Sequence, residues 1–225
     1  PGIMFLLISD LYRAVEAKGG PVRITASYLE IYNENLRDLL GVDDDVHIEL
    51  REDPQQGVTV AGVTEYEMNS AQDVFDILQK GGKNRTTDSH NLNEASSRSH
   101  AVLMLCVEQL SQDQSSTVTS ANLTMIDLAG SERAKKTGSN KKMLREGAKI
   151  NRSLLSLANC INALGSKRTG VYVPYRDSKL TRLLKESLGG GAHTVMIANV
   201  SCAASQFDET RETLVYANRA KNIKV

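Results

Sequence analysis

Apolar segments with two different periods alternate along this sequence of 225 residues. Short runs rich in β-branched residues predict strands, whereas longer stretches with apolar side chains every three or four positions predict helices. The clearest helix covers 143–164, and the clearest strands are 22–31, 101–107 and the apolar run that ends at Asp127. Alternation of this kind is typical of an α/β fold built around one sheet.

The remaining predicted elements are shorter. We expect helices at about 3–17, 71–79, 177–189 and 208–222, a helical turn at 33–40, and short strands at 46–50, 58–60 and 194–200. Glycine after a helix allows the left-handed backbone of a C-cap, so we interpret the run Gly189-Gly190-Gly191 as the end of a helix.

Composition is that of an ordinary globular domain, with 40% hydrophobic and 24% charged residues. The longest apolar run, Ile3–Ile8, is too short to cross a bilayer, so no membrane association is expected. The three cysteines are far apart in apolar stretches and predict buried free thiols: Cys106, Cys160 and Cys202. The four histidines show no ligand spacing, which argues against a metal site built from side chains alone.

Charge is divided unevenly along the chain although the total is zero. The net charge is −12 over 1–132, +11 over 133–192 and +1 over 193–225. Unless these segments interleave in space and neutralise each other, the basic segment predicts a face that binds an acidic partner. A nucleic acid is one such partner, but only Tyr172 and Tyr175 accompany the basic residues, so stacking on single strands has little support.

Two polar loops flank apolar strands. The hydroxyl-rich run 93–100 precedes one strand, and 127–132 follows another. An Asp at the carboxyl end of a buried strand is where α/β proteins place ligands, and it is able to hold Mg²⁺ through water. A glycine three residues later lets a backbone N–H approach a phosphate. Each loop alone is weak evidence, since such an Asp commonly forms a turn, but together they match one family.

The sequence resembles the kinesins over essentially all of its length. The run 93–100 is similar to their switch I, and 127–132 is similar to their switch II. Further similar segments are 27–34, 150–154, 173–181 and 219–221. The segments 51–53, 83–86 and 99–103 resemble the eighth kinesin class, whose members walk to microtubule plus ends and limit polymer length.

The resemblance implies the α/β, three-layer architecture of a P-loop nucleotidase with a mostly central mixed sheet. The chain would be a partial motor domain over 1–225, without the N-terminal strands and the phosphate loop. The start of the neck linker would lie at about 221–225.

Nucleotide-site roles follow from the same resemblance. Ser97 would be a ligand of Mg²⁺, Ser96 would hold the attacking water, and Asn93 would contact the nucleotide. Asp127 would hold the metal through water, and the N–H of Gly130 would sense the γ-phosphate of ATP.

A salt bridge between Arg98 and Glu132 would close the two switches when ATP is bound. An ion pair in a partly dry site orders both loops only while phosphate and metal are present. The alternative is an exposed pair worth less than about 1 kcal/mol, which would have no switching power.

In kinesins the basic segment, about 135–188 here, meets the acidic surface of tubulin. Attraction of this sort steers encounter and weakens with salt. The implied microtubule-binding residues are Lys135, Lys136, Lys141, Lys142, Arg145, Lys149, Arg152, Lys167, Arg168, Arg176, Lys179 and Arg182. Kinesins usually carry Asn at the position of Lys149, whose extra charge near the helix start opposes the helix dipole.

No G-x-x-x-x-G-K-[ST] phosphate loop occurs in the sequence. Two near matches, Gly57–Gly62 and Gly165–Gly170, are each followed by valine and lack the phosphate-binding lysine. The resemblance therefore implies a microtubule-stimulated ATPase that uses ATP and Mg²⁺, while we expect these residues alone to be inactive. The alternative is a nucleotide-independent microtubule-binding module derived from a kinesin.

The expected setting is that of a cytoskeletal motor. We expect the protein in the cytoplasm on microtubules, with the spindle and the cilium as candidate sites. The parent protein is expected to be a dimer joined through a stalk that these residues do not include.

Overall fold

The computed structural model describes residues 2–42, 46–53, 57–87, 98–112, 116–130, 141–166, 170–221 and 223, with only the backbone described over 141–151. The chain forms two compact units. The first contains 1–31, 36–48 and 62–129, and the second contains 32–35, 49–61 and 130–225.

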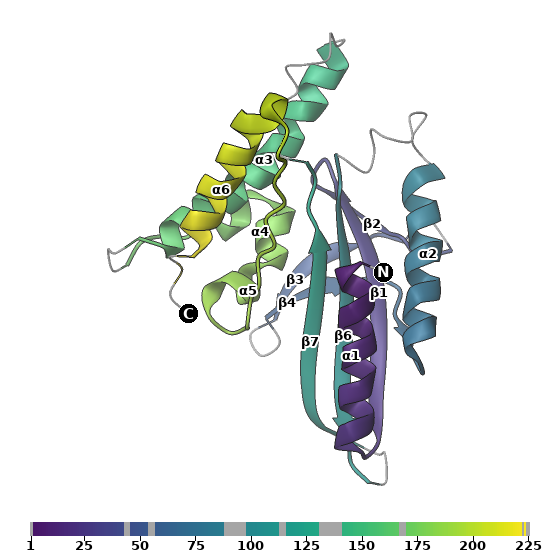
Figure 1. Ribbon diagram of the computed structural model, residues 1–225. Coiled ribbons are helices and arrows are strands. Elements are labelled where there is room, and N and C mark those ends of the chain that lie inside the picture. Colours follow the sequence, from purple (N-terminus) through teal and green to yellow (C-terminus); the bar gives the residue numbers. More distant parts are fainter. Residues whose placement is uncertain are drawn as a thin grey trace. The chain divides into compact units, whose positions relative to one another are not determined.

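The first unit is built on a twisted sheet whose strand order is β2-β1-β6-β7 (Figure 1). Its strands are β1 (Val22–Tyr32), β2 (Asn35–Asp38), β5 (Tyr66–Glu67), β6 (His100–Leu110) and β7 (Thr117–Asp127). β1 pairs antiparallel with β5 and β6, and β6 pairs antiparallel with β7. The long strands are rich in β-branched and apolar residues, which fit a pleated, half-buried surface.

Two helices share one core with this sheet. They are α1 (Ile3–Lys18) and α2 (Ala71–Thr87). Ile8 of α1, Val74 of α2 and Leu103 of β6 are fully buried in the same cluster, and the rings of Phe5 and Phe75 lie 4.6 Å apart. Burial of apolar side chains on both helices therefore fixes them against the sheet.

The second unit is mainly helical. Its elements are β3 (Glu49–Asp53), β4 (Gly57–Ala61), α3 (Lys141–Leu164), η2 (Tyr175–Asp177), α4 (Lys179–Leu183), α5 (Lys185–Gly189), η3 (Ala204–Gln206) and α6 (Phe207–Ala220). α3 packs against η2, α4, α5 and α6, and Leu157, Ile161 and Leu180 are buried there. β3 and β4 pair as a separate two-stranded sheet.

Most predicted elements are confirmed, and the α/β class is confirmed with them. The short strand expected at 58–60 corresponds to β4, but the one expected at 46–50 overlaps β3 only at Glu49 and Leu50, and the long helix begins two residues before its predicted start. The expected burial of all three cysteines is wrong, because only Cys160 is buried, while Cys106 is half-buried and Cys202 is exposed. Gly190 has the expected left-handed backbone after α5, with φ 106°. Within the described residues, no helix is both long and apolar enough to span a membrane.

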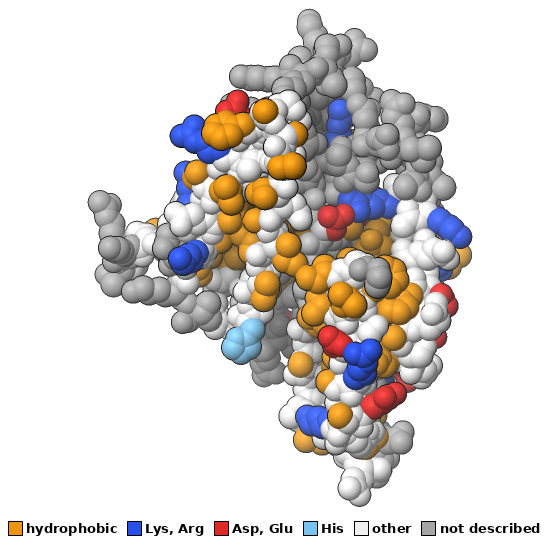
Figure 2. Space-filling model, viewed as in Figure 1, with side chains coloured by type: hydrophobic (Ala, Val, Ile, Leu, Met, Phe, Trp, Pro, Cys, Tyr) orange, Lys and Arg blue, Asp and Glu red, His pale blue; other side chains and the backbone are white. Residues whose placement is uncertain are grey.

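Two predicted elements are wrong. Residues 33–40 do not form a helical turn, because a two-residue turn leads directly into β2, which pairs with β1. Pairing with a neighbouring strand overrides local preference here. Residues 194–200 do not form a strand, since no described strand pairs with them and an unpaired strand leaves its backbone groups unsatisfied. Apolar side chains of this segment are exposed, including Val195 at 85% and Ile197 at 55%. Figure 2 shows hydrophobic side chains at the surface along the chain that leads to α6.

α2 is longer than predicted and ends at Thr87 instead of about Gln79. The helix runs through Gly81, where a Cβ atom would lie 2.3 Å from a ring carbon of Tyr28. Glycine is therefore required for close packing of α2 on β1 and does not end the helix. The extra turns bring the side chain of Arg85 to Ser99, just before β6, and to Asp127 at the end of β7.

Candidate functional site

The start of β6 and the end of β7 lie side by side, with Ala101 opposite Asp127 in antiparallel register. Residues 98–100, the end of the predicted switch I, therefore lie next to 127–129, the beginning of the predicted switch II. The antiparallel pairing alone accounts for this juxtaposition, because adjacent ends of a two-strand ladder must meet.

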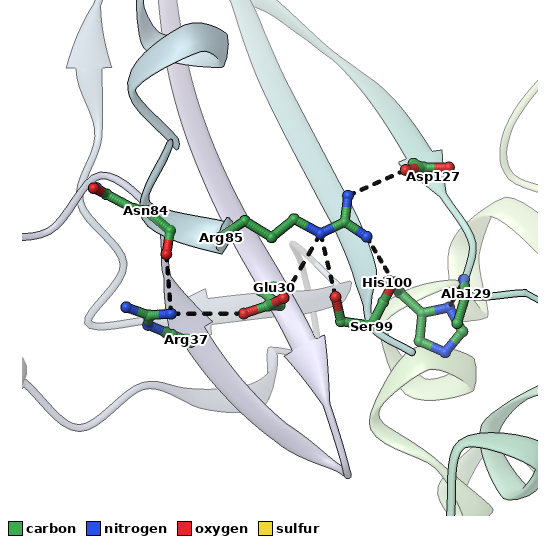
Figure 3. A network of polar contacts seen from close by, with 8 residues as sticks. All are labelled: Glu30, Arg37, Asn84, Arg85, Ser99, His100, Asp127 and Ala129. Atoms are coloured by element: carbon green, nitrogen blue, oxygen red, sulfur yellow. Dashed lines mark hydrogen bonds and ion pairs between the residues drawn. The ribbon is translucent and has the colours of Figure 1, made fainter. Parts of the chain in front are cut away.

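Arg85, near the end of α2, is the centre of a polar network at this edge of the sheet (Figure 3). Its side chain is only 9% exposed. Nη1 donates to Oδ2 of Asp127 over 3.1 Å, Nη2 donates to the carbonyl oxygen of Ser99 over 2.8 Å, and Nε donates to Oγ of Ser99 over 3.2 Å. One guanidinium group thus joins the residue that precedes β6 to the last residue of β7.

A buried carboxylate balances this buried cation. Oε1 of Glu30, whose side chain is 8% exposed, lies 3.7 Å from Nε of Arg85. Oε2 of Glu30 lies 3.9 Å from Nη1 of Arg37, which also donates to the carbonyl oxygen of Asn84 over 3.3 Å. Because each buried charge has an opposite charge nearby, the network is stable only while its members remain together.

His100 fixes the backbone that follows β7. Its ring is buried, and Nδ1 accepts a hydrogen bond from the N–H of Ala129 over 2.9 Å. Burial, and secondarily the charge of Arg85, lower the pKa of His100 to about 4. The ring is therefore neutral at pH 7, as an accepting Nδ1 requires. The chain leading to Gly130 is consequently attached to the start of β6.

Asp127 presents a carboxylate suited to a hydrated cation. Its side chain is 65% exposed, and Oδ2 is bound by Arg85. Among the described residues there is no group of three His, Cys, Asp or Glu side chains able to enclose a metal. Mg²⁺ typically keeps several waters and takes one or two carboxylates together with substrate phosphates, so the side chains present fit a magnesium–nucleotide complex.

Several predicted nucleotide-site residues lie outside the described residues: Asn93, Ser96, Ser97 and Glu132. The Mg²⁺ ligand Ser97 and the pair between Arg98 and Glu132 therefore stay predictions. Arg98 itself lies in the turn before β6, and Gly130 is half-buried directly after Ala129.

The predicted microtubule-binding residues belong to the second unit. Arg152 in α3 is exposed. The backbone of α3 includes four more of them, whose side chains are outside the described set: Lys141, Lys142, Arg145 and Lys149. The others outside the described residues are Lys135, Lys136, Lys167 and Arg168.

The remaining three cations lie on η2 and α4. Arg176 is 75% exposed and donates to Oε2 of Glu52 over 3.2 Å, which lowers the pKa of that carboxyl group. Lys179 is half-buried. Arg182 is half-buried and donates from Nη2 to the carbonyl oxygen of Leu50 in β3 over 3.2 Å. One nitrogen of Arg182 is thus committed to the protein's own backbone.

Sequence reasoning missed the two residues at the centre of the network, Arg85 and Glu30. Arg85 lies in the segment 83–86, which indicated a kinesin class, but the predicted helix ended before it. Glu30 lies within the predicted strand 22–31, where the alternation of apolar and polar side chains gives no sign of a special role. The available signal was the presence of Glu30 inside a predicted buried strand and of Arg85 just after a predicted helix. A charged side chain that is buried needs a partner of opposite charge.

Comparison with known proteins agrees with this geometry. The kinesin motor domain family model matches residues 1–223. The whole chain aligns with kinesin-like protein KIF19 of Homo sapiens at 50% identity, KIN-8B of Arabidopsis thaliana at 47% and KIP3 of Saccharomyces cerevisiae at 49%. The chain spans 23%, 28% and 29% of these relatives, respectively. Relatives named KIN-8 confirm the resemblance to the eighth class.

Two solved structures share the fold. A fast kinesin matches 99% of this chain with a TM-score of 0.88 at 38% identity, and 63% of that chain is covered. The motor and motor homology domain of Kar3Vik1 matches 97% of this chain with a TM-score of 0.84 at 35% identity, and 57% of that chain is covered. Since the family model matches residues 1–223 and the backbone of solved kinesins matches nearly the whole chain, the chain belongs to the kinesin motor domain family.

Proposed function

We propose that the chain is the nucleotide-sensing and microtubule-binding part of a motor head that hydrolyses ATP and moves along microtubules. The observation that carries the proposal is the network in which Arg85 joins Ser99, in the predicted switch I, to Asp127, in the predicted switch II. A charge-paired junction of this kind, with Arg85 and Ser99 buried, gives two loops a common response to a nearby charge.

Bound Mg²⁺–ATP supplies the cation and the γ-phosphate to which the switches respond. Arg85 holds one oxygen of Asp127, so the carboxylate keeps its orientation toward solvent. His100 holds the N–H of Ala129, which restricts the position of Gly130, the proposed γ-phosphate sensor. In this family a lysine of the phosphate loop contacts the β- and γ-phosphates. The two segments that nearly match the phosphate-loop motif do not supply it, and one of them, Gly57–Gly62, lies largely in strand β4.

The basic residues of α3, η2 and α4 would bind the acidic surface of the microtubule. Their charge supports an association that is steered by electrostatics and weakened by salt. We place the protein on cytoplasmic microtubules. From the resemblance to the eighth class we further propose movement toward plus ends with control of polymer length as its specific activity, and dimerisation through a stalk as its assembly.

The test is ATP turnover by the full-length protein with and without microtubules. We expect microtubules to accelerate turnover, and we expect Asp127→Asn to lower the stimulated rate by about tenfold or more, equivalent to at least about 1.4 kcal/mol of transition-state stabilisation. Asp10→Asn is the matched control, because Asp10 forms an exposed ion pair with Arg13 on α1. Microtubule binding without ATP turnover would contradict the proposal and favour a nucleotide-independent binding module.

A further inference from the structure

The turn between β1 and β2 has an unusual backbone. Its two residues, Asn33 and Glu34, both have positive φ, at 52° and 63°. Residues other than glycine rarely adopt this conformation, although it suits a two-residue turn between neighbouring strands. The conformation costs backbone free energy, and such residues persist where the surrounding structure determines their position. Glu34 is one of the motif residues by which the sequence resembles kinesins, yet the proposed ATPase and microtubule contacts assign it no role.

The carboxylate of Glu34 binds the beginning of α4, 144 residues further along the chain. Oε1 accepts a hydrogen bond from Oγ of Ser178 over 2.8 Å, and Oε2 accepts one from the backbone N–H of Lys179 over 2.7 Å. Oγ of Ser178 in turn accepts from the N–H of Leu180 over 3.2 Å. Glu34 therefore completes the N-cap of α4, and all of these residues belong to the second unit.

The cap lies in a protected environment. Ser178 is 2% exposed, and Leu180 and Thr181 are fully buried. Hydrogen bonds from a hydroxyl and an amide to a carboxylate are strong under such conditions, and a negative charge at a helix N-terminus is favourable. The five-residue α4 is too short to be stable through its own hydrogen bonds, so its position depends on contacts with other elements.

We propose that Glu34 is a positioning residue that fixes the start of α4 and thereby presents Lys179 to the acidic surface of the microtubule. The inference rests on the proposed microtubule-binding function. Glu34 acts through the backbone of Lys179 and through Ser178, and it needs no contact with the partner itself.

Replacing Glu34 distinguishes positioning from charge by the sign of the effect. Glu34→Gln removes a negative charge beside a basic face, so electrostatics alone would tighten binding to acidic tubulin. Positioning predicts the opposite, because an amide accepts only one of the two hydrogen bonds and turns its NH₂ group toward the other donor. We expect the dissociation constant for microtubules to rise by about fivefold or more.

The experiment is microtubule cosedimentation of the full-length protein, titrated to saturation. Glu186→Gln is the matched control: Glu186 is exposed on α5 and makes no hydrogen bond or ion pair found among the described residues, so its loss should leave affinity unchanged or tighten it. Ser178→Ala, which removes one part of the cap, should weaken binding in the same direction as Glu34→Gln. The plateau of the titration should stay at the wild-type level, since a merely structural role would lower the fraction able to bind and not the affinity of that fraction.

Three results separate the possibilities. Wild-type protein that fails to bind microtubules would overturn the proposed function. If wild type binds but folded Glu34→Gln binds as tightly or more tightly, the positioning role is wrong. Should Glu34→Gln not fold, wild-type affinity in folded Ser178→Ala would equally overturn it.

Discussion

The two units use their charged residues in different ways. In the first, Arg85 and Glu30 are less than a tenth exposed, and their charges serve each other and Asp127. In the second, Arg152 and Arg176 are exposed, and Arg176 pairs with Glu52 at the surface. The net charge along the sequence indicates only the exposed cations of the second unit, because the two members of a buried ion pair cancel in the net charge. The difference teaches that the proposed nucleotide site is organised by paired charges that are buried, whereas the proposed microtubule face keeps its charged side chains at the surface.

The largest expected effect comes from breaking the buried pair. Arg85→Met removes the guanidinium and leaves Glu30 buried without this partner, so we expect the free energy of unfolding to fall by about 3 kcal/mol. Urea unfolding measures this change. Arg13→Met, which breaks an exposed pair with Asp10 on α1, should change stability by less than about 0.5 kcal/mol. Equal losses in the two variants would show that burial is not what distinguishes the network.

A smaller effect is expected from pH through His100. Its pKa is near 6.5 in an unfolded chain and about 4 in the folded protein, so between these values the unfolded state binds more protons. The stability that the neutral, buried ring of His100 contributes is therefore fully present above about pH 6.5. This contribution, roughly 2 to 3 kcal/mol, is lost as pH falls toward 4. Comparing the urea midpoints of wild type and His100→Gln at pH 7.5 and 4.5 isolates this contribution, since Gln accepts the Ala129 hydrogen bond without titrating. Parallel pH profiles for the two proteins would contradict the assignment.

The smallest effect concerns Arg182, which belongs to the predicted microtubule-binding residues but also bonds to the protein's own backbone. Arg182→Lys keeps the charge but loses the geometry of the bond to Leu50, so we expect a loss of about 1 kcal/mol in stability. Arg176→Lys, at an exposed pair, should leave the urea midpoint unchanged. If neither substitution alters stability while both weaken microtubule binding equally, Arg182 belongs with the exposed cations.

Local patterns predicted most of the fold. Periodicity located the long helix α3 and the strands β1, β6 and β7, and capping chemistry located the glycine run that ends α5 at Gly190. The strand expected at 194–200 has the right composition, but strand formation depends on a neighbour that local sequence does not specify. The end of α2 was misplaced because the fit of Gly81 against Tyr28 is a tertiary contact.

The candidate site was predictable only in part. The segments around Asp127 and His100 carry a family pattern, and strand pairing brings them together. The role of Arg85 depends on three partners from distant parts of the chain, and Glu34 caps a helix 144 residues away. Local sequence indicates that a charged residue in a buried element needs a partner, but it does not say which residue that partner is.

The most direct test of the motor assignment is the affinity of the full-length protein for microtubules in two nucleotide states. If the junction at Arg85, Ser99 and Asp127 transmits the presence of the γ-phosphate, cosedimentation should be tight with a non-hydrolysable ATP analogue and weaker with ADP. Identical affinities in the two states, both weakened equally by salt, would contradict nucleotide control and leave only a basic surface that binds microtubules.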